Sequence, residues 1–332
     1  MRILKSVDSY RPDNQHPLFL GLGNFDGVHA AHEELIRRLV QLAKEAGGRS
    51  AVLTFFEHPQ TVLHPGIKPQ LLTSPDQKLF LLKGLGVDLC FLLPFTSHFS
   101  KTEPAEFVEE ILVKKLKVRH VCLGFNARFG HNRRGDAKMM SELAARFGFE
   151  FDEMNPVKKA GDFVSSSRIR KLVEKGQLEE AFECLSRPFS IFAEVVRGEG
   201  RGAGLGTPTA NLKPQNDILP PQGVYPVTVR VLKPLSKEPG DLEPGPWLQG
   251  VLNYGLRPTF GGSNKEAIAE VFIFDFKENL YGGLVEVVFH PLLRTERAFS
   301  GPEALKDQIA KDVEAVKHYF RQSKKIFTKT AS

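Results

Sequence analysis

The sequence predicts two domains of different architecture: an α/β domain, then an antiparallel β-barrel or sandwich closed by a helix. Its 332 residues are about twice the length of a usual domain. The hydrophobic pattern also changes near Phe189. Short apolar runs alternate with amphipathic helical runs before this point, whereas strand-like runs with Pro- and Gly-rich connectors follow it. We therefore expect domains at residues 1–187 and 188–332.

The first domain is expected to follow a βαβ rhythm. Apolar runs predict strands at residues 18–23, 50–56, 87–95, 119–125 and 149–154, and amphipathic runs predict helices at 32–47, 74–86, 103–116 and 137–148. This alternation predicts a parallel sheet covered on both faces, with ligands at the carboxyl ends of its strands. The glycine-containing strand exits are therefore the places to search for a site.

The second half begins after a predicted helical pair at residues 165–188, which Pro188 ends. Alternating or β-branched runs then predict strands at residues 190–198, 223–233, 247–255, 266–276 and 283–294, and helical spacing predicts a closing helix at 302–322. Successive strands without helices between them indicate an antiparallel barrel or sandwich.

The composition indicates an ordinary globular protein, with 41% hydrophobic and 25% charged residues. The sequence has no apolar run of membrane-helix length and no secretory start, so we expect a cytoplasmic protein without a membrane partner. Cys90, Cys122 and Cys184 are far apart in apolar surroundings. Buried, unbridged thiols are therefore expected.

The formal net charge of +6 favours anionic ligands such as phosphates or nucleic acid. Basic residues are interspersed with acidic ones, and no RNA-binding or zinc-finger signature accompanies them. Nucleic acid is therefore the less favoured partner.

The first motif that carries chemistry is GLGNFDGVHAAHEELI, a strand exit followed by a glycine-rich turn and a helix start. His29 and His32 are three residues apart and share one helix face. Because a helix N-terminus attracts anions, the two imidazoles favour stabilisation of a transferring phosphoryl group. A zinc pair and two surface histidines remain alternatives.

Two later segments have the residue types that bind phosphate. GFNARFGHNRRGD follows an apolar strand, and VSSSRIRKL places three hydroxyls before Arg168 and Arg170 at a helix start. Hydroxyls, amides and arginines together can bind a polyphosphate. An ordinary N-cap followed by a basic helix explains VSSSRIRKL equally well.

A glycine-rich segment opens the second domain. Its amides can face phosphates, although it lacks the Walker A pattern and no helix follows it. Thr209 and Asn211 come next, at alternate positions, and their oxygens suit a Mg2+ ion shared with ATP. A turn before an edge strand is the alternative. The glycines expected to bind the nucleotide are Gly198, Gly200, Gly202 and Gly206.

In order and spacing, these motifs resemble the prokaryotic bifunctional riboflavin kinase/FAD synthetase family. GNFDGVHAAH, TFFEHP, GFNARFG, RRGD and VSSSRIR are similar to its FMN adenylyltransferase module, of the HxGH nucleotidyltransferase group. PTAN, GVYPVTV, GVLNYGLRPTFGG, AEVFIFDF, LYG and LLRTERAF are similar to its riboflavin kinase module. The resemblance implies a Rossmann-like nucleotidyltransferase domain and a six-stranded barrel.

This resemblance implies phosphorylation of riboflavin to FMN and transfer of AMP to FMN with release of pyrophosphate, using ATP and Mg2+ in both steps. In the adenylyltransferase module it implies that His29 and His32 stabilise the α-phosphate and that Ser165, Ser166 and Arg168 hold the departing pyrophosphate. The nucleotide-binding residues would be Gly23, Asn24, Phe25, Asn126, Ser165 and Ser166.

In the kinase module the resemblance implies that Glu270 is the catalytic base and that Arg294 and Glu296 lie near the flavin. A carboxylate at the ribityl hydroxyl can accept its proton as the new P–O bond forms. An outward-facing solvent residue is the alternative for Glu270. A surface ion pair between Arg294 and Glu296 is the alternative for the other two.

Several positions depart from the family pattern. Ala31 replaces the glycine between the two histidines, where a methyl group would approach the nucleotide. The other departures are Glu57, Ala127, Ser167 and Thr207. They leave two further hypotheses open: a monofunctional riboflavin kinase with an impaired first domain, and a non-enzymatic flavin- or nucleic-acid-binding regulator.

Overall fold

The computed structural model describes residues 1–57, 59–63, 66, 70–197, 209–258, 265–276 and 278–327. The chain forms two compact units. One contains Met1–Ser166 with Glu238–Gly240, and the other contains Ser167–Lys237 with Asp241–Ser332. The predicted bridging helices belong to the second unit, and the boundary at residue 187 stays a prediction.

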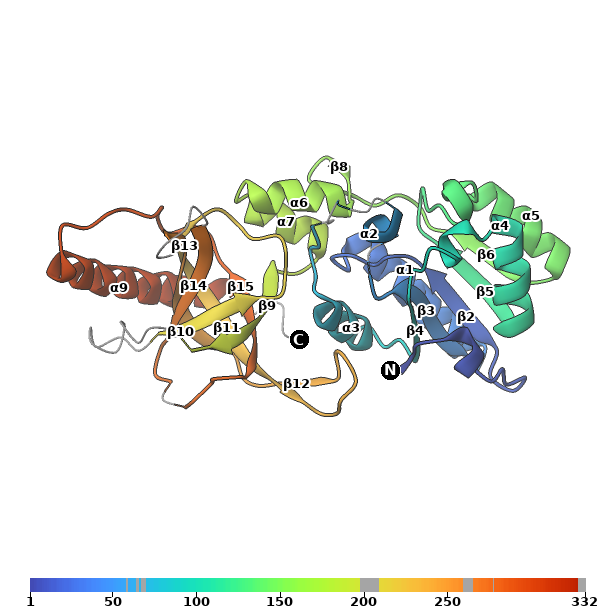
Figure 1. The fold of residues 1–332 in the computed structure, drawn as a ribbon, viewed down its shortest axis with the longest axis horizontal. Helices are drawn as coiled ribbons and strands as arrows, with labels where there is room; N and C mark the ends of the chain where they lie inside the picture. Colours follow the sequence, from blue (N-terminus) through green and yellow to red (C-terminus); the bar gives the residue numbers. More distant parts are fainter. Residues whose placement is uncertain are drawn as a thin grey trace. The chain divides into compact units, whose positions relative to one another are not determined.

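A six-stranded parallel sheet forms the centre of the first unit, in the order β1-β4-β3-β2-β5-β6 (Figure 1). Its strands are β1 (Arg2–Leu4), β2 (Leu18–Leu22), β3 (Arg49–Phe55), β4 (Leu89–Leu93), β5 (Val118–Leu123) and β6 (Glu150–Glu153). All five predicted strands are present. The edge strand β1 is an addition, because three residues are too few to show a period.

Helices cover both faces of this sheet, as the βαβ rhythm predicts. Side chains of α1 (Ala30–Glu45) and α3 (Pro75–Gly84) pack in one apolar cluster with Phe19 and Cys122. Side chains of α5 (Ala137–Phe147) and η3 (Phe107–Lys115) pack in the other. The predicted helix 103–116 is a short α-helical turn, α4 (Pro104–Glu106), followed by the π-helix η3, a distinction that apolar spacing does not reveal.

Shorter elements connect these layers. They are the helix α2 (Pro59–Leu63), the 3-10 turns Val7–Ser9, Phe99–Lys101 and His131–Arg133, and the hairpin of β7 (Lys158–Lys159) and β8 (Asp162–Phe163).

The strand order reverses direction at β2. The chain passes from β2 through α1 to β3 on one side of β2, and later adds β5 on the other side. The loops after β2 and β5 therefore leave the sheet in opposite directions, and ligands of open α/β sheets bind at such a switch point. Both loops carry predicted site residues.

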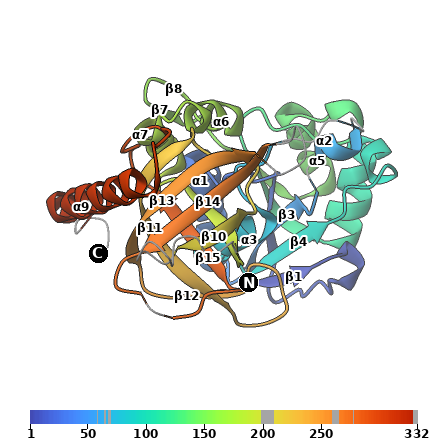
Figure 2. The same cartoon turned by 60° about the vertical axis from the view of Figure 1, so that its left-hand side comes forward.

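A closed six-stranded barrel forms the second unit (Figure 2), because β11 pairs with β15 and completes the order β11-β13-β14-β10-β9-β15. Its strands are β9 (Ser190–Val196), β10 (Ala210–Pro214), β11 (Gly223–Pro234), β13 (Leu248–Pro258), β14 (Lys265–Ile273) and β15 (Leu284–Phe289). A short strand, β12 (Leu242–Pro244), pairs antiparallel with the end of β11. The five predicted strands are confirmed. The strand β10 lies between β9 and β14, so the alternative of an edge strand there is wrong.

Three helices complete the second unit: α6 (Ser166–Glu174), α7 (Leu178–Leu185) and the closing helix α9 (Pro302–Phe327). Val316 and Phe320 of α9 are buried against Val224, Val251 and Phe274. The three cysteines are buried and form no disulfide, as predicted. Within the described chain, none of the helices combines the length and the apolar character needed to cross a membrane.

Candidate active sites

The two predicted catalytic histidines lie together at the end of β2. His29 caps the N-terminus of α1, and its Nδ1 accepts a hydrogen bond of 3.4 Å from the backbone N–H of His32. The two rings stack with centroids 3.6 Å apart and an interplanar angle of 13°. Because Nδ1 of His29 accepts, the proton of the neutral ring is on Nε2, which can donate to a phosphate oxygen.

The loop before these histidines has an unusual backbone. Phe25, Gly27 and Val28 have φ values of 51°, 81° and 37°, in the left-handed region. Phe25 is fully buried and packs edge-to-face on His32, with centroids 5.2 Å apart. A Cβ at Gly23 would lie 3.2 Å from the Phe25 ring. Gly23 and Phe25 therefore shape this loop by packing.

Contacts from distant segments hold the loop in place. The Asp26 carboxylate accepts from the backbone N–H groups of Leu72 and Thr73 at 3.0 and 3.2 Å, and Gly27 N–H donates to the Thr73 hydroxyl at 3.1 Å. Ser166 donates its hydroxyl hydrogen to the Asp26 carbonyl at 2.9 Å. The predicted pyrophosphate residue Ser166 is thus bonded to the loop that carries the histidines.

The sequence reasoning missed the contribution of Asp26 and Thr73. Asp26 lies in the GLGNFDGVHAAHEELI motif, but Thr73 is 47 positions from Asp26 in the sequence. Nothing in the sequence indicates that the two residues are in contact.

The remaining predicted residues of this site lie at different points. Asn126 is exposed in the turn after β5, with φ of 62°, at the same sheet edge as the histidine loop because β5 neighbours β2. Ser165 directly precedes α6. Arg168 is the third residue of α6 and belongs to the second unit, so its role toward pyrophosphate stays a prediction.

In the barrel, Glu270 is at the centre of a row of polar side chains. It lies directly opposite Asn211 of β10 on one side and Asn253 of β13 on the other. Residues opposite each other in antiparallel strands point to the same face, with Cβ atoms about 5 Å apart. Its neighbours Ala269 and Val271 are only 2% and 1% exposed and point into the barrel, so the half-buried Glu270 lies on the outer face. The sequence reasoning did not find Asn253.

The donor set of this row fits a hard divalent cation. Asn211 offers an amide oxygen and Glu270 a carboxylate, and the hydroxyl-bearing Thr209 directly precedes β10. Oxygen donors of these kinds are the ligands that Mg2+ prefers. The predicted phosphate-binding glycines Gly198, Gly200, Gly202 and Gly206 lie outside the described residues, as does Thr207.

Arg294 has a different partner from the one considered in the sequence. Its guanidinium binds the Asp312 carboxylate of α9 through Nε at 3.0 Å and Nη2 at 2.7 Å. The alternative of a surface pair with Glu296 is therefore wrong. The Glu296 carboxylate lies over Gly255 of β13, where any Cβ would collide with it. Whether either residue contacts flavin stays a prediction.

One further group of metal-type side chains lies in the described part of the chain. His120, Cys122 and Asp152 place their ligand atoms within 4.8 Å of one another. Arg38 lies 3.5 Å from the Asp152 carboxylate, and burial raises the pKa of Cys122 to about 12. A neighbouring cation and a protonated thiol both oppose metal binding. Among the residues that the structure describes, no such group of three includes His29 or His32, so the zinc alternative for this pair has no third ligand there.

Comparisons with known proteins match each half of the chain to a family. The FAD synthetase family model matches residues 11–168, and the riboflavin kinase family model matches residues 185–320. A bifunctional riboflavin kinase/FMN adenylyltransferase from Listeria monocytogenes is 36% identical over 91% of this chain and 92% of its own length. The chain belongs to this bifunctional family.

Other members of the bifunctional riboflavin kinase/FMN adenylyltransferase family cover the chain to a similar extent. The Haemophilus influenzae protein is 34% identical over 91% of this chain and 94% of its own length, and the Escherichia coli K12 protein is 30% identical over 98% and 99%. A crystal structure from Streptococcus pneumoniae, described as a macrolide-efflux protein, has a TM-score of 0.79 at 29% identity and covers 95% of this chain and 98% of its own.

Proposed function

We propose that this protein makes FAD from riboflavin in two ATP-dependent steps. The barrel phosphorylates riboflavin to FMN, and the α/β domain transfers AMP from ATP to FMN. The observation that carries this proposal is the match of two separate family models to the two halves of one chain, residues 11–168 and 185–320. Each half also contains a polar cluster suited to its step.

In the adenylyl transfer, a phosphate oxygen of FMN attacks the α-phosphorus of ATP. A new P–O bond forms as the bond from the α-phosphorus to the bridging oxygen breaks, and pyrophosphate leaves. His29 and His32 stand at the N-terminus of α1, where ring N–H groups and the helix dipole stabilise negative charge on the oxygens of the α-phosphate. Ser165, Ser166 and Arg168 bind the departing pyrophosphate.

In the kinase step, Glu270 accepts the proton of the riboflavin 5'-hydroxyl as that oxygen bonds to the γ-phosphorus of ATP and ADP leaves. Asn211 and Thr209 would hold Mg2+, which supplies neutralisation of the phosphate charge when bound. Asn253 extends the polar row on the other side of Glu270 and orients the carboxylate or the sugar chain.

The two rival hypotheses are less well supported. A kinase with an impaired first domain would not need an intact histidine pair, yet His29 and His32 stack at the helix start. A non-enzymatic regulator would need neither polar cluster. Both family models and the nearly full-length relatives favour the bifunctional enzyme.

The deciding experiment is the flavin product profile of the purified protein with riboflavin, ATP and Mg2+. We expect FMN to form first and FAD to follow, as resolved by chromatography with fluorescence detection. FMN without FAD would support the kinase alone. Absence of both products would refute the enzymatic assignment.

A further inference from the structure

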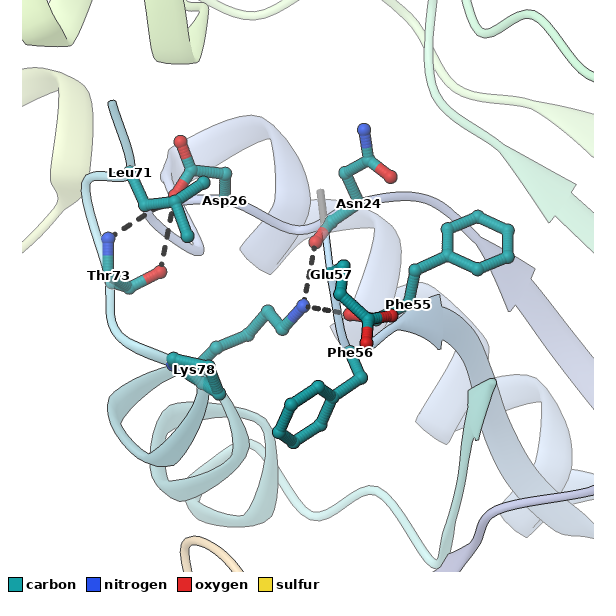
Figure 3. A pocket seen from close by; sticks show the side chains of 9 residues that line it. Asn24, Asp26, Phe55, Phe56, Glu57, Leu71, Thr73 and Lys78 are labelled. Atoms are coloured by element: carbon teal, nitrogen blue, oxygen red, sulfur yellow. Dashed lines mark hydrogen bonds between the residues drawn. The ribbon is translucent and has the colours of Figure 1, made fainter. Parts of the chain in front are cut away.

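Lys78 is a buried cation that neither the sequence motifs nor the mechanism above uses. It lies near the start of α3 and is 9% exposed. Its Nζ donates to the Phe55 carbonyl at 2.9 Å and to the Asn24 carbonyl at 3.4 Å (Figure 3). It also donates to the Thr54 hydroxyl at 3.3 Å. Burying a charged group is costly unless it is compensated, so the position requires a specific reason for a lysine.

The number of bonds decides how this ammonium acts. A lysine ammonium has three donor hydrogens, and three protein oxygens surround it. With these bonds made, no hydrogen is left for a substrate phosphate. Lys78 therefore acts through the chain segments that it joins, which are the end of β3 and the loop after β2.

A short stretch of sequence holds this loop on both sides of Phe25. Lys78 binds the carbonyl of Asn24, just before Phe25, and the backbone N–H groups of Leu72 and Thr73 bind the carboxylate of Asp26, just after it. Phe25 has a φ of 51°. A bulky residue keeps a left-handed backbone only where its surroundings hold it there.

We propose that Lys78 is a positioning residue for adenylyl transfer, which fixes the loop of residues 23–28 and thereby the histidine pair that follows it. The link to the pair is direct, because the ring of Phe25 packs edge-to-face on His32. Displacing reacting groups by about 1 Å can lower a rate about 100-fold. This inference rests on the proposed function of the first domain.

The protonation state of Lys78 should make the rate of FAD formation depend on pH. Burial lowers the pKa of Lys78 to about 8, while the nearby Cys90 and Asp26 act in the opposite direction. Burial raises the pKa of Cys90 to about 12, so its thiol is neutral, and Glu57 lines the same pocket from the end of β3. Above about pH 8 the amine loses one of its three donor hydrogens, and one contact with the loop is lost.

The test uses full-length wild type, Lys78→Met and Lys78→Arg, supplied with FMN and ATP. For Lys78→Met we expect kcat for FAD formation to fall about 100-fold, with KM for ATP changed much less, because the binding groups remain but are misplaced. Lys78→Arg should recover most of the rate. Wild-type kcat should decline above about pH 8, whereas the rate of Lys78→Arg should not decline there, because a guanidinium stays charged.

Riboflavin phosphorylation by the Lys78 variants is the internal control, and its rate should match that of wild type. The matched variant is Lys44→Met, which removes an exposed lysine of α1, and its rate of FAD formation should also match wild type. If wild type forms FAD and Lys78→Met forms it at the same rate, the inference about Lys78 is overturned while the proposed function stands. The same holds if Lys78→Met loses both activities in parallel, or if the rate of Lys78→Arg falls with pH as that of wild type does. No FAD from wild type would instead refute the proposed function.

Discussion

Replacing Glu270 by glutamine tests the kinase mechanism most directly. Glutamine has nearly the same size as glutamate, and it keeps the cross-strand positions opposite Asn211 and Asn253. The substitution therefore removes the ability to accept a proton while leaving the polar row and the barrel in place. Positioned general bases contribute about 10²- to 10⁴-fold to a rate, which is about 3–5 kcal/mol of transition-state stabilisation.

The assay follows FMN formation from riboflavin and ATP, and separately FAD formation from supplied FMN, in the same preparation. We expect the first rate of Glu270→Gln to fall by 10²-fold or more and the second to stay at the wild-type value. Glu194→Gln is the matched control, since Glu194 is an exposed carboxylate on β9 of the same barrel. Wild-type FMN formation by Glu270→Gln would refute its role as base, and equal loss of both activities would refute the assignment of one reaction to each domain.

Three further predictions concern other parts of the chain. His29→Ala and Arg168→Ala should each lower FAD formation about 10²- to 10³-fold and spare FMN formation, since each removes a donor to a charged phosphate; normal FAD output from either would contradict the phosphate site. Ala31→Gly should raise the rate of adenylyl transfer, because it removes a methyl group where the nucleotide is expected to bind. It should also lower the stability of α1 by about 1 kcal/mol. An unchanged rate would show that the methyl group does not hinder nucleotide binding. Burial lowers the pKa of His290 from its usual 6.5 to about 4, so between these pH values the unfolded chain binds a proton that the folded barrel does not. The free energy of unfolding should therefore fall by up to about 3 kcal/mol as pH drops from 6.5 toward 4. Thermal unfolding of His290→Gln across this range should be flatter with pH than that of wild type, and an identical slope would exclude His290 as the cause.

The architecture could be predicted from the sequence because local patterns determine it. The central strands β2 to β5 of the first sheet are short apolar runs. The helices α1, α3 and α5 each begin after a residue whose side chain caps them: Ser74, for example, accepts from Gln77 N–H, and Asp136 accepts from Met139 N–H. The pairing of His29 and His32 also follows from their spacing along one helix. The π-helix η3 was not predicted, because π-helices are rare and the apolar residues of so short a segment predict a helix without specifying its hydrogen-bond pattern.

Partners that are far apart in the sequence could not be predicted. Arg294 was considered with Glu296, two residues away, yet it binds Asp312 on the closing helix. Asn253 became visible only through the register of β13 with β14, since a shift of one residue would turn it to the opposite face. In both cases tertiary pairing decides which polar groups meet.

Lys78 illustrates why the supporting residues of a site are harder to find than its reacting residues. In the sequence it belongs to a predicted helix, and a helical lysine normally faces solvent. The fold buries it because α3 packs on the sheet beside the end of β3, and there its ammonium compensates two backbone carbonyls and a hydroxyl. A mechanism that depends on placing two imidazoles at an α-phosphate needs a loop with one conformation. The left-handed backbone of Phe25 does not provide this by itself, and Lys78 and Asp26 hold it from both sides.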